Sequence, residues 1–389
     1  MRNEDVWFDP DSGNYDEFVA ELERTADPTL WPLAADIENN VLIYAGDAVR
    51  SFAASATQRR AIMTEWVHAW RTGPGIIVIR NAFADHSVVD CATALFDDII
   101  ERQHPCREGG GDHFAAPGAN DRIWNALQKH CLADPENFAR YYANATIALA
   151  SDAWLGKGYE VTAQVNRVNP GGATQVGHRD YHLGFMDGTT ASRYPQHVHG
   201  VSPMLTLQGT IAHCDMPIES GPTLYLPGSQ RFAAGYCAYG RAEFQDYFNA
   251  HRVQLPLHKG DVVFFNPAVM HAAGENRTRD VSRLANLLQV SSPFGRSIET
   301  VDRVAMATAL YPNLVRLHDS GVLSDVELEH VVAATAEGYA FPTNLDRDPP
   351  VDGIAPGSQA EMLRQALRDG LDAAQFAALL AQRAQRRET

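Results

Sequence analysis

Short runs of strand-forming residues, separated by Gly, Pro and Asn turns, fill the stretch from residue 159 to residue 293. Several short strands spaced by turns are typical of a β-sandwich or a barrel. The stretch shows no alternation of strands and helices, which disfavours a doubly wound parallel sheet. We therefore expect a β core here, with strands over residues 161–168, 204–212, 223–226, 261–266 and 284–290.

Helical patterns flank this β-rich stretch on both sides. Before it, Ile62, Trp66 and Trp70 recur at the spacing of one helical face, which predicts a helix over residues 58–71 with a buried aromatic stripe. The same region is expected to hold a buried strand and two more helices, over residues 76–79, 85–103 and 135–155.

After residue 296 the chain becomes helical again. Ser324 and Ser358 each precede a glutamate by three residues, which is the pattern of a capping box that opens a helix. The last helix is expected over residues 358–386, with leucines along one side. The sequence leaves open whether that side packs on the β core or on a second copy of the chain in a homo-oligomer.

The charge balance and the cysteines narrow the classes of function. Of 389 residues, 32 are Lys or Arg and 48 are Asp or Glu, a formal net charge of −16, which disfavours nucleic acids and anionic membranes as partners. No apolar run is long enough to cross a membrane, and the first residues lack the features of a signal peptide. The five cysteines include no C-x-x-C pair and fit a reducing compartment. We expect a cytoplasmic protein that acts on a small molecule.

Residues 177–180, Gly-His-Arg-Asp, carry the strongest chemical signal. In an extended chain, residues two apart point to the same side, so His178 and Asp180 could bind one metal ion together. His271, just after the strand expected over 261–266, supplies a third ligand. Two histidines and one carboxylate on a β scaffold form the facial triad of non-haem Fe(II) oxygenases, which leaves coordination positions open.

Arg283 directly precedes the strand expected over 284–290, and a hairpin would bring it to the same end of the barrel as His271. Its companions Ala285 and Leu287 are apolar, so this side of the strand is expected to face inward. An inward arginine needs a carboxylate partner, and its planar guanidinium suits a two-point contact. The distal carboxylate of 2-oxoglutarate, a co-substrate of iron oxygenases, would provide that partner.

Four segments stand in a characteristic order along residues 73–292. Residues 75–83 are a β-branched strand followed by Asn-Ala-Phe, and residues 169–172, Asn-Pro-Gly-Gly, lead into His-Arg-Asp. Residues 220–230 read Ser-Gly-Pro-Thr-Leu-Tyr-Leu-Pro-Gly-Ser-Gln, and residues 259–265, Lys-Gly-Asp-Val-Val-Phe-Phe, precede His271 and Arg283. In this order and spacing the chain resembles the phytanoyl-CoA dioxygenase family of Fe(II)/2-oxoglutarate-dependent oxygenases.

The resemblance implies a fold class that is mainly β with helical additions. Its core would be a double-stranded β-helix, of the jelly-roll or cupin-like kind, flanked by N- and C-terminal α-helices. It also implies an organisation in three parts. These are an N-terminal extension, the oxygenase domain with its packed helices and a C-terminal helical extension, over residues 1–58, 59–296 and 297–389.

The resemblance further implies a site and a reaction. Fe(II) would be bound by His178, Asp180 and His271, and 2-oxoglutarate by Arg283, with Gln164 against the co-substrate. O2 would then be used to hydroxylate an unactivated C–H bond of a small metabolite, with release of succinate and CO2. Two positions depart from the family pattern: Ala273 stands where a hydroxyl residue is common, and Gln230 stands where the signature ends in His.

Two other functions remain open at this point. His182 follows Asp180 by two residues, so the same segment could form the zinc site of a hydrolase. The third interpretation is a non-catalytic, cupin-like ligand-binding protein. Residues 183–203 and 107–120 are expected to be loops that shape a substrate pocket. Arg193 and Tyr194 would lie in its wall. His197 and His199 are expected to be solvated loop residues, and His213, at the end of a strand, is expected to be a hydrogen-bonded structural residue.

Overall fold

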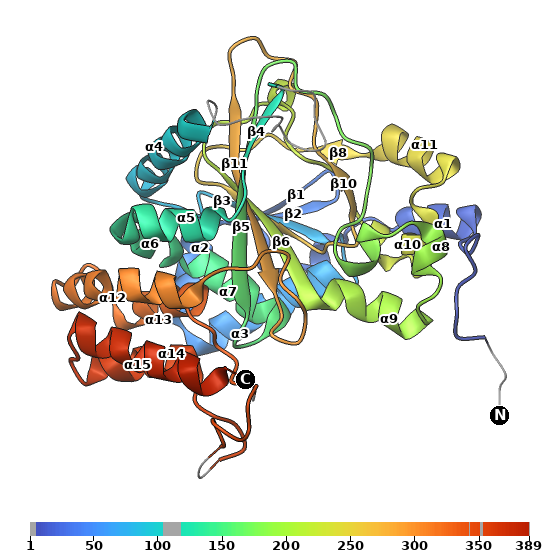
Figure 1. Ribbon diagram of the computed structural model, residues 1–389. Helices are drawn as coiled ribbons and strands as arrows, with labels where there is room; N and C mark the ends of the chain where they lie inside the picture. Colours follow the sequence, from blue (N-terminus) through green and yellow to red (C-terminus); the bar gives the residue numbers. More distant parts are fainter. Residues whose placement is uncertain (1–4, 104–117, 342, 351–352, 389) are drawn as a thin grey trace.

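The computed structural model describes residues 5–103, 118–341, 343–350 and 353–388. A large and a small β-sheet form the centre of the molecule, and helices surround them (Figure 1). The large sheet has the strand order β1-β2-β3-β9-β6-β11-β5-β4, and the small sheet has the order β10-β7-β8. Only β2 and β3 pair in parallel; all the other paired strands in these two sheets are antiparallel.

The strands of the large sheet are β1 Asp36–Glu38, β2 Val41–Ala45, β3 Ile76–Arg80, β4 Asn120–Ile123, β5 Glu160–Val168, β6 Thr206–Ala212, β9 Val262–Phe265 and β11 Arg283–Ser291. Those of the small sheet are β7 Leu224–Leu226, β8 Val253–Gln254 and β10 Met270–Ala272. The helices up to β5 are α1 Tyr15–Leu22, α2 Gly46–Ala54, α3 Ala56–Arg71, α4 His86–Gln103, α5 Ala126–Ala133, α6 Pro135–Tyr142 and α7 Ala145–Leu155. The later ones are α8 Gly188–Ala191, α9 Gln196–Val201, α10 Gly235–Ala238, α11 Ala242–His251, α12 Arg303–Asp319, α13 Asp325–Thr335, α14 Gln359–Arg368 and α15 Ala373–Arg387.

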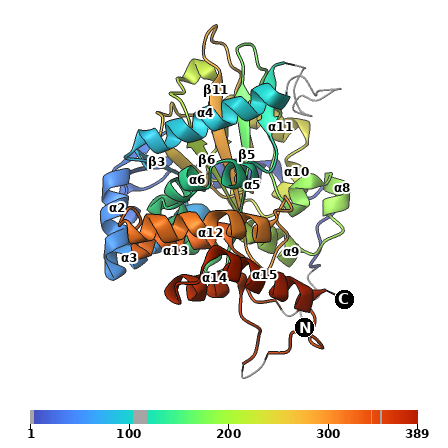
Figure 2. The same cartoon turned by 60° about the vertical axis from the view of Figure 1, so that its left-hand side comes forward.

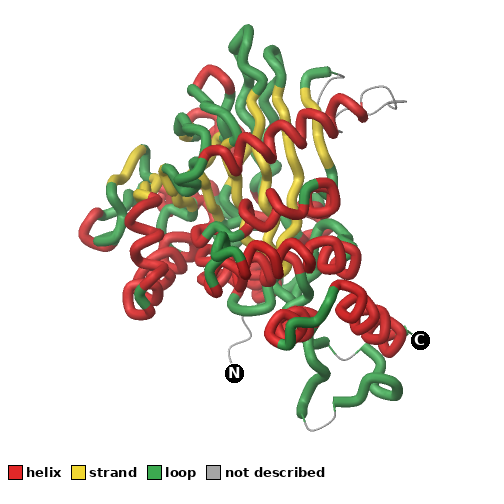
Figure 3. The backbone as a smooth tube through the Cα atoms, turned by 90° about the vertical axis from the view of Figure 1, so that its left-hand side faces the viewer, coloured by secondary structure: helices red, strands yellow, loops and turns green. Residues whose placement is uncertain are grey.

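Both faces of the large sheet are buried, which explains why β3 is an uninterrupted β-branched run. Ile77 and Ile79 pack into the main hydrophobic core under the helices, together with the Trp66 side chain of α3. The alternate residues Ile76 and Val78 pack on the opposite face, in a second cluster that we call the inner cluster. Helices including α4 cross the first face of the sheet (Figures 2 and 3).

The inner cluster joins the two sheets. It contains Val263 and Phe265 of β9, Ala285 of β11 and, from the small sheet, Tyr225 of β7. The Phe265 and Tyr225 rings meet edge to face, with their centroids 5.1 Å apart. The small sheet is therefore held against the inner face of the large one. This places the inner-facing side chains of β5, β6 and β11 toward the interior of the β core.

Most of the expected elements are present, and two predicted helices are divided at capping residues. The helix predicted over 58–71 is α3, and both Ser324 and Ser358 form complete capping boxes. The helix predicted over 135–155 is divided into α6 and α7, because Asn144 leaves the helical conformation and caps α7. The last predicted helix is divided into α14 and α15, because Gly370 has a φ of +63° and Asp372 caps a new helix.

The large sheet with its packed helices is consistent with the expected cupin-like core. A mainly β chain is not confirmed, because 47% of the chain is helical. The helices after residue 302 contribute much of this fraction, and they pack on the rest of the chain: α12 contacts α5 and α6. The leucine side of the last helices, with Leu363 and Leu380, is buried in the main core. Within the described residues, no helix combines the length and the apolar character needed to cross a bilayer.

Candidate metal centre

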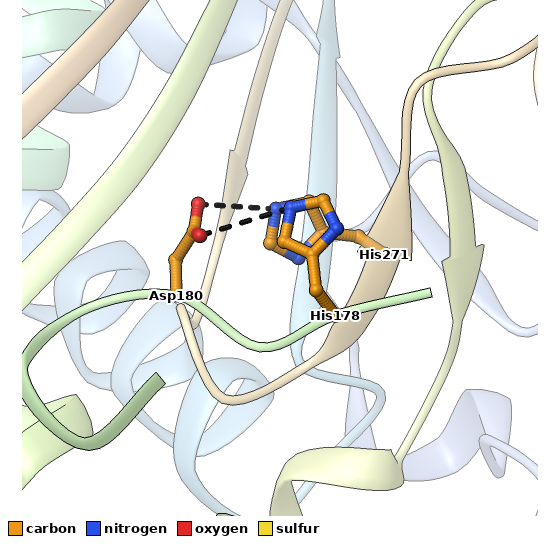
Figure 4. Close-up of side chains that lie close together, drawn as sticks. All are labelled: His178, Asp180 and His271. Atoms are coloured by element: carbon orange, nitrogen blue, oxygen red, sulfur yellow. Dashed lines mark ion pairs between the residues drawn. The ribbon is translucent and has the colours of Figure 1, made fainter. Parts of the chain in front are cut away.

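Three side chains from distant parts of the sequence converge beside β10 (Figure 4). His178 and Asp180 lie in an extended segment after β5 rather than on a regular strand, and His271 is the middle residue of β10. The backbone aligns them, because His178 N donates to His271 O and His271 N donates to His178 O, both at 2.9 Å. Asp180 N also donates to Pro267 O at 3.0 Å.

Both imidazoles are oriented by the same kind of contact. His178 Nδ1 lies 2.9 Å from Val176 O, and His271 Nδ1 lies 2.9 Å from Val269 O. A carbonyl oxygen can only accept, so Nδ1 carries a proton in each ring, and in the neutral ring Nε2 keeps its lone pair. His178 Nε2 lies 3.7 Å from Asp180 Oδ1, and His271 Nε2 lies 3.4 Å from Asp180 Oδ2. Two lone pairs and one carboxylate therefore face one another.

This arrangement fits a bound metal ion. The ligand atoms of His178, Asp180 and His271 all lie within 4.8 Å of one another, and within the described part of the chain no other cluster of three or more such side chains meets this condition. Nitrogen and oxygen ligands bind such ions at roughly 2.0–2.2 Å, which three atoms at these separations can reach with small side-chain adjustments. His182 is not part of the cluster; its Nδ1 lies 3.5 Å from Ser202 Oγ.

The local electrostatics favour the protonation states that a metal ion requires. Burial, the largest influence, would raise the pKa of Asp180, but the facing imidazoles of His271 and His178 and the Gln208 amide outweigh it and lower the pKa below its ordinary value. Burial is the main cause that lowers the pKa of His178, and the charge of His271 adds to it. An ionised carboxylate and a neutral imidazole are the metal-binding forms of these side chains.

Arg179, between the two ligands in the sequence, anchors their segment to the protein. Its buried guanidinium donates to Ser229 O and lies over the ring of Tyr236, 5.4 Å from the ring centroid. Burial lowers the pKa of Arg179 to about 10. Gly235 leaves the space for this side chain, because a Cβ at that position would overlap the guanidinium. The packing of Arg179 thus fixes the backbone that carries His178 and Asp180.

Arg283 is a buried cation that is not paired with any carboxylate of the described residues. It is the first residue of β11, only 4% of it is exposed, and its Nε and one terminal nitrogen make no hydrogen bond. Among the residues that the structure describes, no carboxylate lies within ion-pair distance of it. Burial lowers the pKa of Arg283 to about 10. Since Ala285 belongs to the inner cluster, Arg283 at the same side of the strand faces the interior of the β core.

The connection between His271 and Arg283 differs from the expected hairpin. His271 lies in the small sheet, where it is paired with Tyr225, and Arg283 lies in the large sheet, where it is paired with Val168. The two residues therefore come from different sheets.

Gln164 lies on β5, where it is paired with Leu287 and so faces the same side as that residue. Its Oε1 accepts a hydrogen bond from Arg122 at 3.0 Å. The side chain is 3% exposed, so it lies inside the β core rather than on its surface. The neighbouring strand β4, which carries Arg122, had no signal in the sequence strong enough to be predicted.

Two of the three other histidines considered above, His199 and His213, are buried and make polar contacts. His213 is buried between Thr93 Oγ1 and Tyr141 OH, at 2.8 Å from each. His197 is exposed as expected, but the expectation of a solvated His199 is wrong, because His199 is buried with its Nε2 3.0 Å from Ala191 O.

The two expected pocket loops have different outcomes. Residues 183–203 are not a plain loop, since they contain α8, α9 and two short 3-10 segments. Arg193 and Tyr194 are exposed there. Of the predicted loop over 107–120, residues 107–117 lie outside the described residues, and residue 120 begins β4.

Two buried glutamines beside the cluster were not predicted. Gln208 of β6 and Gln289 of β11 are paired in register. Gln208 Nε2 donates to Asp180 Oδ2 at 2.6 Å, and Gln289 Oε1 accepts from Tyr181 OH at 2.8 Å. Their only signal in the sequence is that a polar residue occupies a strand position that faces inward. This signal can be recognised only when the register of the strand is known.

Comparison with known protein families assigns the chain to one of them. The model of the phytanoyl-CoA dioxygenase (PhyH) family matches residues 57–285, so the chain belongs to that family. The family uses Fe(II), 2-oxoglutarate and O2. No curated protein matches the sequence significantly.

Several solved structures are similar to the chain at low identity. The non-heme, alpha-ketoglutarate-dependent epimerase SnoN from nogalamycin biosynthesis is 18% identical, over 60% of this chain and 84% of its own, with a TM-score of 0.40. The carbocyclase SnoK from the same biosynthesis is 20% identical, over 59% and 83%, with a TM-score of 0.41. HygX from Streptomyces hygroscopicus, with nickel and 2-oxoglutarate bound, is 15% identical, over 61% and 90%, with a TM-score of 0.39.

Proposed function

We propose that this chain is an Fe(II)/2-oxoglutarate-dependent dioxygenase that hydroxylates an unactivated C–H bond of a small metabolite. His178, Asp180 and His271 would bind Fe(II), and Arg283 would bind the distal carboxylate of 2-oxoglutarate, with Gln164 beside the co-substrate. The observation that carries this proposal is the convergence of two imidazole Nε2 atoms and one carboxylate on one point. Membership of the PhyH family supports the choice of metal and co-substrate.

The chemistry divides between the bound groups and the protein. When bound, Fe(II) would activate O2 while 2-oxoglutarate loses CO2 and becomes succinate, so that one oxygen atom enters succinate and the other the product. His178, Asp180 and His271 would occupy one side of the ion and leave the opposite side for co-substrate and O2. Arg283 would orient the co-substrate by a charge-assisted contact at its far end.

The same proposal extends to the organisation of the chain. Residues 59–296 would form the oxygenase domain, with residues 1–58 and 297–389 as extensions that cover it. The cysteines that the structure describes are free thiols: Cys91, Cys131, Cys214 and Cys237. Free thiols support a cytoplasmic location.

Turnover of 2-oxoglutarate tests the function directly. With Fe(II), ascorbate and air, the purified protein should convert 2-oxoglutarate to succinate and CO2, and a screen of small metabolites should find compounds that accelerate this conversion. His178→Ala should abolish the conversion, because it removes one of three ligands, whereas His197→Ala, a change at an exposed histidine, should not. Turnover that is supported equally by Zn(II), or that survives in His178→Ala, would contradict the proposal.

A further inference from the structure

Gln208 lies in the interior of the β core and contacts a single oxygen of the metal-binding carboxylate. Its side chain is 3% exposed, and its Nε2 donates to Asp180 Oδ2 at 2.6 Å. The opposite orientation of the amide would bring its oxygen against a carboxylate oxygen, and two acceptors repel each other. The contact is therefore an N–H···O bond to a charged acceptor, which is among the stronger kinds of hydrogen bond in proteins.

The neighbouring glutamine holds the next residue of the same segment. Gln289 is paired with Gln208 across β6 and β11, and its Oε1 accepts from Tyr181 OH. Tyr181 and His182 both have positive φ values, 66° and 46°, which residues with a side chain adopt only at a cost of about 1–3 kcal/mol each. A strained turn thus follows Asp180 directly, and adjacent glutamines on two strands hold the two residues at its start.

We propose that Gln208 is a positioning residue of the metal centre, which engages Oδ2 of Asp180 and leaves Oδ1 to bind the ion. This role rests on the proposed function, since it takes Asp180 as a metal ligand. The carboxylate would then be held in its binding orientation before the ion arrives, so that less rotational freedom is lost on binding. Loss of a side chain that hydrogen-bonds a metal ligand typically weakens metal binding by about 10–100-fold.

The state of the amide oxygen of Gln208 supports a position of this side chain inside a binding site. Its Oε1 is buried and accepts no hydrogen bond from the described residues. A buried acceptor without a partner is costly, so a donor from outside the protein, such as water or a hydroxyl group of a ligand, would satisfy it. The amide therefore faces Asp180 on one side and has a free acceptor on the other.

Cobalt binding by the full chain tests this role without requiring turnover. Co(II) can be titrated into the metal-free protein and followed by its visible absorption, and unfolding can be measured on the same samples. Gln208→Met keeps the length of the side chain but removes the donor, and it should bind Co(II) about 10–100-fold more weakly than the wild type. Gln208→Asn, whose amide is too short to reach Asp180, should show the same loss if the Met variant does not fold.

A distant buried glutamine provides the control. Gln359 of α14 donates to Arg303 O at 3.1 Å and accepts from Glu337 N at 2.9 Å, so Gln359→Met should lower stability but leave the Co(II) affinity unchanged. A folded Gln208→Met protein that binds Co(II) within twofold of the wild type would overturn the role of Gln208 and leave the metal centre intact. A wild-type protein that binds no Co(II) would overturn the metal centre itself, and this role with it.

Discussion

Replacing Arg283 by Met should change co-substrate affinity and stability in opposite directions. This arginine is buried and makes no ion pair with a carboxylate in the part of the chain that the structure describes, and burial lowers its pKa from 12.5 to about 10. At about 1.36 kcal/mol per pKa unit, keeping the side chain charged at pH 7 costs the folded state roughly 3 kcal/mol relative to the unfolded chain. Met removes this charge and fills a similar volume, so the free energy of unfolding should rise by up to about 3 kcal/mol.

The same change should abolish most of the binding of 2-oxoglutarate. A carboxylate held by the guanidinium would make two charge-assisted hydrogen bonds, each contributing about 1.5–3 kcal/mol. Their loss corresponds to a dissociation constant weaker by roughly two to four orders of magnitude. Calorimetric titration of 2-oxoglutarate into the Co(II)-loaded protein measures the affinity, and urea unfolding of the metal-free protein measures the stability.

Arg303 is the matched control for this prediction. It is a partly buried arginine whose pKa is also lowered by burial, but it donates to backbone carbonyls, among them Val161 O at 3.0 Å. Arg303→Met should therefore lower stability and leave the affinity for 2-oxoglutarate unchanged. An Arg283→Met protein that binds 2-oxoglutarate as tightly as the wild type would refute the assignment of Arg283 as the carboxylate anchor.

Two further changes test the packing and the electrostatics away from the ligands. Gly235→Ala places a Cβ on the guanidinium of Arg179, so it should lower the free energy of unfolding by about 1–3 kcal/mol and weaken Co(II) binding. Gly240→Ala is the control, because its Cβ meets no other atom, and it should change neither property. Equal urea midpoints for the two variants would contradict the packing described for Arg179. Burial raises the pKa of Glu65, although hydrogen bonds from Tyr44 and the backbone oppose it, so protonation favours the folded state. The wild type should therefore gain stability relative to Glu65→Gln as the pH falls from 8 toward 4.5, and a difference that is independent of pH would show that this carboxyl group does not titrate as described.

The sequence predicted the parts of the fold whose signals are local. The β-branched run of β3, the aromatic stripe of α3 and the capping boxes at Ser324 and Ser358 depend on neighbouring residues only, and all are present. The points at which two predicted helices are divided also carry local signals. Asn144 is a residue type that caps helices well, and Gly370 is followed by Asp372, another good cap.

The structure of the site depends on contacts that no local pattern encodes. The three residues of β10 are too few to show a period, so the pairing of His271 with Tyr225 and its bridge to His178 could be seen only in three dimensions. The contact of Gln208 with Asp180 likewise requires the register of β6 against its neighbours. The types of residue that could bind a metal were predictable, but the residues that hold them in place were not.

The most direct test of the metal centre is the visible spectrum of the protein with Fe(II) and 2-oxoglutarate in the absence of O2. Co-substrate bound to the ion through two oxygen atoms should produce a weak band in the green-yellow region. We expect this band in the wild type and its loss in His178→Ala, where one of the three ligands is missing. A wild-type protein that shows no band and instead retains tightly bound zinc would contradict an oxygenase built on His178, Asp180 and His271.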